Sequence, residues 1–541
     1  METQPTERRT IPGLPAEWRE HAAQAAAGLL TEIAGNPWGT MSPSVYETAR
    51  LVRTAPWLDG HGARCDFLLR TQRPDGWWGH PDGYDLVPTL SATEALLHEL
   101  DRSAADPGPP AAPIARAALK GLWALADRLH AGQRGAVPDT IAAELVVPWL
   151  VDELNTRLAA SRGRLGAAEL HLPEGCDRRP LDGLRAAVTA GRPLPEKLWH
   201  ALEVLGDRAA GAPGVRPVAA AVGSSPAATA AWLAGRPPHE EAARSLARAQ
   251  ARWGGPVPGV ISIAVFERAW VVGWLLDAGV PMTVPRELTA YLENSLDTGG
   301  APAGPGLPAD ADDTAAVLHA LALAGRPVSP ASLWAYQGDD YFRCFPGERT
   351  PSTSTNAHVL EALLATTAAS REPSAAKARH QAAVRTTEDW LLAMQHQDGS
   401  WDDKWHASPY YATMCCAVAL ARGRHPDTPA AVARAARWTL ESQRPDGSWG
   451  RWAGTVEETA YALHTLLRAH PGALPPEVSR AVAGGCARLL ADPGDDFAPL
   501  WHDKDLYTPV TVVKAARLAA LHAAVTRLAP AGPPAAHSFV R

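Results

Sequence analysis

Cysteine is scarce in this 541-residue sequence, which contains only six. The cysteines are scattered, none forms a C-x-x-C pair, and no histidine cluster has the spacing of metal ligands. Disulfide frameworks and structural zinc sites both need such groupings, so the sequence favours neither of them. The sequence is typical of a protein of the reducing cytoplasm.

An excess of basic residues is also missing. Lys and Arg number 51 against 58 Asp and Glu, a formal net charge of -7, which gives nucleic-acid binding little support. The N-terminus has no apolar run of the kind that a signal peptide needs, and charges interrupt the alanine-rich segments well short of a membrane span. Because 46% of the residues are hydrophobic and 20% are charged, we expect a folded, soluble protein with two or three domains.

Alternating β-branched runs are rare, whereas Ala and Leu recur at i, i+3, i+4 and i+7 throughout the chain. This period predicts an all-α fold. The 49 prolines and 45 glycines lie mostly between the helical stretches, as at 103–113 and 297–308, and indicate loops and linkers.

A short unit occurs three times in the sequence. It reads QRPDGWWG from Gln72, QHQDGSW from Gln395 and QRPDGSWG from Gln443. Asp-Gly favours a tight turn, Gln can bond backbone groups at a neighbouring helix end, and Trp can cover the junction with a large apolar face. The repeats predict stacked helical hairpins, open as a solenoid or closed as a toroid, with the Gln and Trp side chains in a structural role.

A cluster of carboxylates precedes one apolar helical stretch. The segment ADADDTAAVLHAL at 309–321 aligns with GTVEETAYALHTL at 454–466, which places Thr455 opposite Asp310. Because three carboxylates this close cannot all ionise cheaply, at least one of Asp310, Asp312 and Asp313 should keep its proton in a desolvated cavity and could act as a general acid. The alternative is a solvated acidic helix start, or a cation site.

The D-x-D-D-T-A motif and the Q-x-x-D-G-S-W units together resemble the class II terpene cyclases, which protonate an alkene to start a carbocation cascade. Other segments narrow the resemblance to the bacterial diterpene branch, of the copalyl diphosphate synthase type. In order along nearly the whole chain, they are SPSVYETA (42–49), LVPTLSATEALL (86–97), DTIAAELVVPWL (139–150), SSPAATA (224–230), FERAWVV (266–272), CFPGERTPSTSTNAHVLEAL (344–363), DKWHASPYYAT (403–413) and LWHDKDLYTP (500–509).

This resemblance implies that Asp312 is the proton donor and that Asp310 and Asp313 orient it and tune its acidity. It also implies two α-barrel domains. A γ domain at about 41–255 would be inserted in a β domain made of about 1–40 and 256–541, with the substrate in the cavity between them. Such chemistry needs a site without water and aromatic walls for the cation.

The resemblance further implies an isoprenoid diphosphate substrate, C20 geranylgeranyl diphosphate, handled with Mg²⁺. We leave the metal ligands unassigned. Each candidate diphosphate contact could instead be a solvated side chain or the partner of a neighbouring acid. The candidates are Lys404, Lys504, Arg343 and Arg349.

Class I terpene synthases ionise the diphosphate with a DDxxD motif, and the nearest pattern here, DDYFR from Asp339, ends in Arg343. The product should therefore be a bicyclic diphosphate, an isomer of the substrate, that a downstream class I synthase could take. Asn356 and His358 lie in a segment that matches the family, but the base that ends the cascade stays unassigned.

Other interpretations are open. A related cyclase could convert farnesyl diphosphate to a drimenyl skeleton with the same acid. A squalene-hopene-type cyclase shares both motifs but is generally longer and carries an apolar membrane-binding patch. A non-catalytic helical toroid scaffold would explain the repeats but not Asp310, and a protein prenyltransferase β subunit would need a zinc site that the sequence does not suggest.

Overall fold

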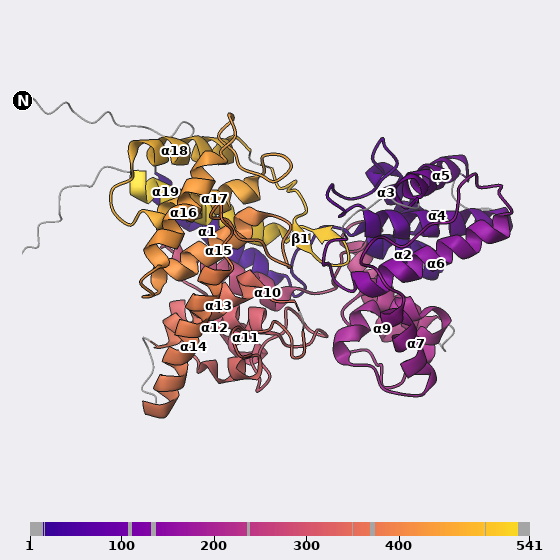
Figure 1. The fold of residues 1–541 in the computed structure, drawn as a ribbon, viewed down its shortest axis with the longest axis horizontal. Coiled ribbons are helices and arrows are strands. Elements are labelled where there is room, and N and C mark those ends of the chain that lie inside the picture. The colour runs from indigo at the N-terminus through magenta and orange to yellow at the C-terminus, as the bar shows by residue number, and fades with distance from the viewer. Residues whose placement is uncertain are drawn as a thin grey trace, which may run out of the picture.

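The computed structural model describes residues 14–15, 17–105, 111–130, 137–234, 239–348, 350–367, 374–492 and 494–528. Helices dominate this part of the chain and form two lobes (Figure 1). Within it the one sheet is the antiparallel pair β1 (Trp501–His502) and β2 (Leu506–Tyr507), which lies between the lobes. The predicted all-α fold is confirmed.

One lobe is a ring of helices with others packed outside it. Its inner elements follow one another as α2, α4, α6, the 3₁₀ segment η1 and α8, and α8 packs back onto α2. Helices α3, α5, α7 and α9 lie outside this ring. The elements of this lobe are α2 (Val45–Thr54), α3 (His61–Thr71), α4 (Leu86–Ala105), α5 (Ala111–Arg128), α6 (Ala143–Ser161), α7 (Arg179–Thr189), η1 (Glu196–Gly211), α8 (Pro226–Leu233) and α9 (Glu240–Ala251).

The other lobe is a second closed ring. Its inner helices follow one another as α10, α12, α13, α15, α17 and α19, and α19 packs back onto α10. The elements of this lobe are α1 (Trp18–Gly35), α10 (Ala264–Asp277), α11 (Arg286–Ser295), α12 (Ala311–Leu323), η2 (Pro330–Ala335), α13 (Thr353–Thr367), α14 (Ser374–Ala393), α15 (Pro409–Arg422), α16 (Thr428–Glu441), α17 (Val456–Ala469), α18 (Pro476–Ala491) and α19 (Val510–Leu528).

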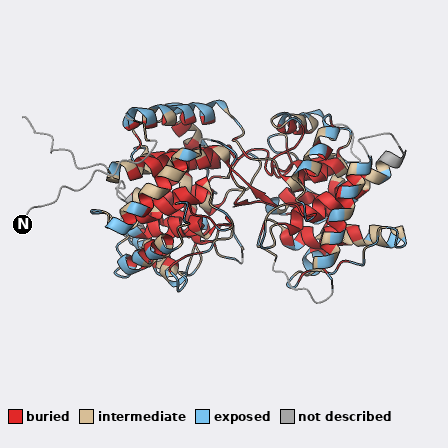
Figure 2. Cartoon of the chain, turned by 90° about the horizontal axis from the view of Figure 1, so that it is seen from above, coloured by how far each residue is buried: buried red, intermediate tan, exposed pale blue. Residues whose placement is uncertain are grey.

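Each lobe buries its own apolar core (Figure 2). One large cluster draws on residues 18–41 and 260–524, and another on residues 46–227. The N-terminal helix α1 packs on α10 and α19, so it belongs to the second ring. The domain boundaries near residues 40 and 255 remain a proposal.

The three repeated units join inner and outer helices as expected. In each, the Gln side-chain amide donates to two backbone carbonyls 2.9–3.0 Å away, one of them on the neighbouring helix. The fully buried Trp donates from Nε1 to the carbonyl of an earlier residue, as Trp449 does to Thr439 at 2.6 Å. Gly447 has a φ of +86°, and a Cβ there would meet the Gly484 backbone at 2.9 Å, so this turn needs glycine.

The tip of the β1–β2 hairpin is inserted into the first lobe. All three tip residues are buried and bonded to that lobe: Asp503 to His200, Lys504 to Glu47 and Glu203, and Asp505 to Ser44 at 2.6 Å. Buried charges are costly unless they are paired. These contacts therefore fix how the two lobes meet.

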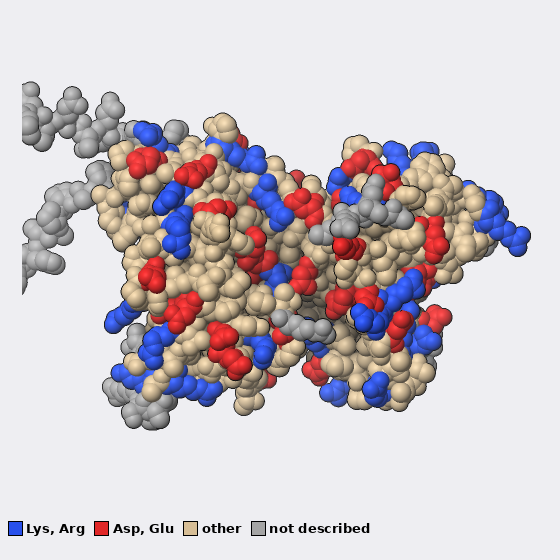
Figure 3. Space-filling model, in the orientation of Figure 1, with Lys and Arg blue, Asp and Glu red and all other residues tan. Residues whose placement is uncertain are grey.

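Acidic and basic side chains are mixed over the face shown in Figure 3. All six cysteines are free thiols. Across the described residues, every helix is too short or too polar to cross a membrane.

Candidate active site

The D-x-D-D motif forms the start of α12. Asp310 is the N-cap residue and accepts a hydrogen bond from the Asp313 amide at 2.8 Å. Thr455 caps α17 in the same way, accepting from the Glu458 amide at 3.0 Å. A single side-chain oxygen is therefore enough to cap the helix, as Thr455 shows. Asp310 caps α12 in the same way but also brings a carboxyl group that Thr455 lacks.

All three aspartates line a cavity between the two lobes, with an empty volume of about 1170 Å³ including its opening to solvent. The first lobe contributes residues between Ile141 and Ala201, and the second contributes residues between Val260 and Tyr507. The apolar walls include aromatic side chains, which the sequence could not assign to the cavity: Phe266, Phe345, Trp405, Trp501 and Tyr507. The cavity fits an extended, largely apolar ligand.

The three carboxyl groups do not all ionise together. Burial and the charge of Asp312 raise the pKa of Asp310 to about 7. Burial and the charges of Asp310 and Asp312 raise the pKa of Asp313 well above its usual value. Near neutral pH the cluster therefore keeps protons inside the cavity, as expected from the sequence.

Asp312 is held by a histidine from the next inner helix. Its Oδ1 lies 2.8 Å from His358 Nδ1, and the two side chains are 15% and 8% exposed. Burial disfavours the charged imidazole, but the carboxylate of Asp312 outweighs burial and raises the pKa of His358. The sequence pointed to the segment of His358 but not to this pairing, because 46 residues separate the two positions.

Asn356, the other polar residue of that segment, has a structural role. Its side chain accepts from the Phe342 amide at 2.8 Å and donates to the carbonyls of Phe342 at 3.0 Å and Ser352 at 2.8 Å. It is fully buried and is not among the residues that line the cavity. Asn356 therefore offers no free group to accept a proton from a ligand.

The aromatic wall is held in place from behind. Trp501 donates from its indole nitrogen to Glu457 at 2.6 Å and meets Phe266 edge-on, with ring centroids 5.1 Å apart. The indole is thereby fixed at the cavity wall, where its ring can stabilise a cation without offering a nucleophilic atom.

A second acid–histidine pair, which the sequence analysis missed, also lines the cavity. Asp503 Oδ1 lies 3.0 Å from His200 Nε2, and His200 Nδ1 donates to the Gly223 carbonyl at 2.7 Å. Although burial opposes ionisation, His200 and Lys504 hold the pKa of Asp503 below its usual value. Asp503 Oδ2 is buried with no hydrogen-bond partner among the described residues. This leaves a carboxylate oxygen able to accept a proton.

Cationic side chains gather at the Glu348 side of the cavity. Lys197, which is 48% exposed, lies 3.2 Å from Glu348 Oε1, and Lys404 lies 2.7 Å from the same oxygen. Lys197 and the exposed Glu144 both line the cavity. Lys197, which the sequence did not distinguish, therefore lines the cavity, whereas the predicted Lys404 is not among the lining residues and lies beside Lys197 through the Glu348 carboxylate that both share.

The structure contradicts the predicted diphosphate contact at Lys504. Its Nζ is fully buried and donates to Glu47 at 2.5 Å, Glu203 at 2.8 Å and Ser225 at 3.0 Å. All three ammonium hydrogens are thus used inside the protein, and Lys504 is not among the cavity-lining residues. Its role is to pair the two carboxylates where the hairpin enters the first lobe.

The two arginine candidates receive no support from the structure. The guanidinium carbon of Arg343 lies 3.7 Å from the position of a Cβ on Gly338, and Arg343 is not among the cavity-lining residues. Arg349 lies outside the described residues. Neither arginine can be placed against a ligand.

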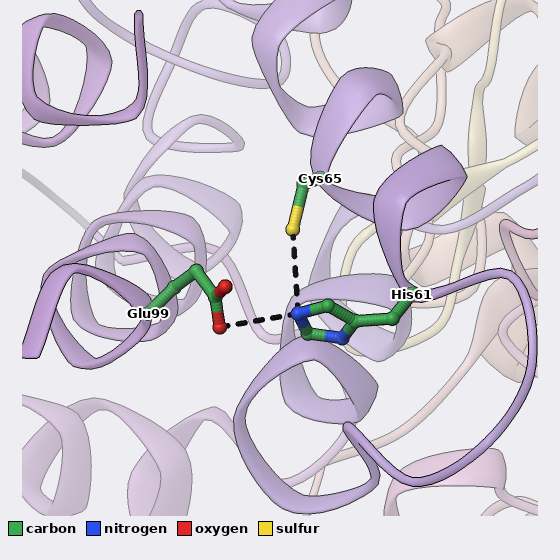
Figure 4. A group of neighbouring side chains, drawn as sticks. All are labelled: His61, Cys65 and Glu99. Carbon is green, nitrogen blue, oxygen red and sulfur yellow. Dashed lines mark hydrogen bonds and ion pairs between the residues drawn. The ribbon is translucent and has the colours of Figure 1, made fainter. Parts of the chain in front are cut away.

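A possible metal-ligand group lies in the first lobe, away from this cavity. His61, Cys65 and Glu99 bring their ligand atoms within 4.8 Å of one another, with His61 Nε2 3.1 Å from Glu99 (Figure 4). Arg102 donates to both oxygens of Glu99, at 2.6 and 2.7 Å, and already balances its charge. Burial raises the pKa of Cys65 to about 12, which disfavours the thiolate that zinc needs. The group is better explained as a neutral hydrogen-bonded cluster.

Comparisons with known proteins place the chain in a family. A model of the squalene-hopene cyclase C-terminal domain matches residues 349–472. An ent-copalyl diphosphate synthase of Streptomyces sp. (strain KO-3988) is 48% identical over 94% of this chain and 97% of its own length. The chain belongs to the class II diterpene cyclases. The labda-7,13-dienyl diphosphate synthase of Streptomyces clavuligerus is also 42% identical to this cyclase over 96% of both chains.

Solved structures agree with this assignment. The ent-copalyl diphosphate synthase from Streptomyces platensis superposes on the cyclase with a TM-score of 0.87 and 49% identity, covering 93% of this chain and 99% of that one. The diterpene relatives match nearly the full length, whereas the squalene-hopene model matches only a part, so a squalene-hopene-type cyclase is not favoured. The repeats belong to an enzyme and not to a scaffold.

Proposed function

We propose that this class II cyclase converts geranylgeranyl diphosphate to a bicyclic diphosphate by protonating the terminal alkene with Asp312. One observation carries the proposal: Asp312 lines an apolar cavity with aromatic walls while His358 holds one of its oxygens. A carboxylic acid in this position can protonate carbon because few competing acceptors reach it.

The geometry supports a defined direction for the proton. In this proposal His358 Nδ1 donates to Oδ1 of Asp312, 2.8 Å away, which leaves Oδ2 to carry the acidic proton. The same hydrogen bond stabilises the carboxylate that remains after proton transfer. Asp310 and Asp313 keep protons of their own and limit the negative charge around it.

The cavity also supplies the later steps. Trp501 and Phe266 face the cation that forms during ring closure and stabilise it through their ring faces. We assign the final deprotonation to Asp503, whose Oδ2 has no partner among the described residues. The new double bond forms as the proton leaves carbon for this carboxylate, directly or through one water.

The diphosphate end belongs beside Lys197 and Lys404, whose charges match it. Mg²⁺ typically binds through one or two carboxylates together with substrate phosphates. Glu144 lines the cavity, and Asp139 lies 4.0 Å from Lys404, so exposed carboxylates are available where the diphosphate would lie. These residues fit a Mg²⁺ ion, which would neutralise the diphosphate when bound.

The identity of the product is part of the proposal. Relatives at 48%, 42% and 36% identity are named for ent-copalyl, labda-7,13-dienyl and terpentedienyl diphosphates. The higher identity favours a copalyl product of the ent series. A class I synthase that ionises the retained diphosphate is the class of enzyme that would consume it, and a cytoplasmic location stays a prediction.

The test is incubation of purified protein with Mg²⁺ and either geranylgeranyl or farnesyl diphosphate, followed by phosphatase and chiral gas chromatography with mass spectrometry. We expect a bicyclic C20 alcohol that appears only after phosphatase treatment. Asp312→Asn should lose at least about 10²–10⁴-fold in rate with an unchanged circular dichroism spectrum. A hydrocarbon released without phosphatase would contradict the proposal, and turnover of farnesyl diphosphate alone would favour the drimenyl alternative.

A further inference from the structure

The ring of the first lobe encloses a cavity of its own, which we call the ring chamber. It has an empty volume of about 1340 Å³, including its opening to solvent, and every inner element of the ring contributes to its wall. One lining residue from each element in turn is Arg50 of α2, Glu94 of α4, Trp149 of α6, Glu203 of η1 and Ala231 of α8. The ring chamber is therefore the lumen of this ring.

The ring chamber and the substrate cavity lie along different parts of the same elements. On η1, the substrate cavity is lined from within residues 197–201 and the ring chamber from within residues 203–207. On α6, Glu144 lines the substrate cavity, whereas Trp149 and Glu153 line the ring chamber. The two cavities share no lining residue, so a ligand of the ring chamber need not compete with the isoprenoid.

The two arginines of the ring chamber are already engaged within the protein. Glu94 lies 2.9 Å from Arg50 Nη1 and 3.2 Å from Arg53 Nε. Arg50 also donates to the hydroxyl and the carbonyl of Ser91, at 2.8 and 2.6 Å. Although burial opposes ionisation, the two arginines lower the pKa of Glu94. Acidic side chains still outnumber basic ones in the lining by four to two, which favours a cationic ligand.

The acids on the far side from the arginines offer free acceptors. Glu203 is 2% exposed, and its Oε1 accepts from the Tyr46 hydroxyl and from Lys504, both at 2.8 Å. Its Oε2 is buried with no hydrogen-bond partner among the described residues. Nearer to solvent, the half-buried Glu153 and the exposed Asp207 complete the acidic side. A buried carboxylate oxygen without a donor costs free energy, which a ligand that donates to it would recover.

Two indoles add apolar surface to the ring chamber. The buried Trp149 has the guanidinium carbon of Arg50 5.4 Å from its ring centroid. Trp57 also lines the chamber and is 55% exposed. Indole faces attract cations and can cover an alkyl chain. The ring chamber thus combines excess negative charge, an unpartnered buried acceptor and aromatic walls.

We propose that the ring chamber binds a protonated aliphatic diamine. One ammonium group donates to Oε2 of Glu203, the alkyl chain lies against the indoles, and the second ammonium group pairs with Asp207 or Glu153. A primary ammonium suits Glu203 because it carries N–H donors. A quaternary ammonium brings the same charge but leaves Oε2 without a donor. Binding involves no covalent step and does not depend on the reaction in the substrate cavity.

Isothermal titration calorimetry of the purified full-length protein near neutral pH tests the ligand class. The probes are 1,4-diaminobutane, n-butylamine and butyltrimethylammonium. We expect 1,4-diaminobutane to bind one site per chain, and n-butylamine to bind about two- to fivefold more weakly because it lacks the second charge. Butyltrimethylammonium should bind at least about tenfold more weakly than n-butylamine, because it cannot donate to Glu203.

Variants locate the site. Glu203→Gln should weaken binding of 1,4-diaminobutane at least about tenfold, and Asp207→Asn about two- to fivefold. Asp66→Asn, which changes an exposed acid of α3 outside the chamber, is the matched control and should leave the affinity unchanged. Glu144→Gln should also leave it unchanged, because Glu144 lines the substrate cavity. If Glu203→Gln fails to fold, Glu153→Gln combined with Asp207→Asn makes the same test from the opening.

Four results would overturn the diamine site. They are no binding of any amine at millimolar concentration, equal affinity for n-butylamine and butyltrimethylammonium, a loss in Glu144→Gln without one in Glu203→Gln, or binding of Mg²⁺ or inorganic phosphate in place of the diamine at the same residues. The titration is made without turnover. A wild-type enzyme that forms no cyclised product would therefore refute the proposed function and leave the diamine site standing.

Discussion

Replacement of Lys504 by methionine tests the corrected role of this residue. Methionine keeps an unbranched apolar side chain of similar length but removes the ammonium group. Glu47 and Glu203 then face each other inside the seam between the lobes, without the cation that now bonds both at 2.5 and 2.8 Å. Breaking a buried ion cluster by removing one partner typically costs about 3–5 kcal/mol. We expect Lys504→Met to lose about that much free energy of unfolding.

The loss should depend on pH, with a sign that follows from the carboxylates. Burial already raises the pKa of Glu47 from 4.5 to about 7, and Lys504 holds it lower than burial alone would. Without Lys504 the folded-state pKa rises further above the unfolded value. A carboxyl group of this kind stabilises the folded state below the unfolded pKa, and this stabilisation disappears as pH rises through the folded pKa. The deficit should therefore be larger at pH 8 than at pH 6.

The assay is urea unfolding of wild type and Lys504→Met at both pH values, followed by fluorescence of the buried tryptophans, with KM for geranylgeranyl diphosphate measured on the folded protein. We expect lower stability and a KM within about twofold of wild type. Lys504→Met/Glu203→Gln should regain part of the loss, because one unpaired charge is removed. If Lys504→Met has wild-type stability and a tenfold higher KM, the structural role of Lys504 is wrong and its predicted contact with the diphosphate is supported instead.

Four further outcomes are expected. Trp449→Ala should lower the free energy of unfolding by about 3–5 kcal/mol, because a fully buried indole is lost. Gln443→Ala should lower it by about 1–3 kcal/mol, because two carbonyls lose their donor. For either variant, lost activity at unchanged stability in urea would contradict a structural role. If the diphosphate lies beside Lys197, as proposed, Lys197→Ala should raise KM about tenfold at unchanged stability, since its charged end is half exposed. A lower kcat alone would speak against this contact. Asp503→Asn should still consume substrate but yield isomeric or hydroxylated products by mass spectrometry; an unchanged product would remove Asp503 as the base.

Features that depend on neighbours along the chain were predictable from the sequence. The apolar period predicted the helices, and the repeated Gln and Trp units predicted the junctions between them. The D-x-D-D motif identified the acidic cluster because its residues share one turn of helix. The helices and the acidic cluster depend on residues within a few turns of helix. The junctions were predictable for another reason, because the unit recurs in the sequence, although each Gln also bonds a carbonyl 36–45 residues away.

Features that depend on distant segments were decided only by the tertiary structure. Lys404 and Lys504 both stand beside aspartates in motifs typical of the family, yet one lies beside the cavity and the other is enclosed by Glu47 and Glu203. The surroundings of Lys504 follow from how the hairpin tip inserts into the first lobe. No local pattern records that insertion, because it depends on packing between segments hundreds of residues apart.

The acidic motif was therefore readable in the sequence, whereas its environment was not. Asp312 pairs with His358, 46 positions away, and the cavity that surrounds the motif exists only once both lobes have folded and met. Residue types set the chemistry that was available. The folded chain fixed the burial and the hydrogen-bond partners of each carboxyl group. These surroundings decide which carboxyl group can act as an acid.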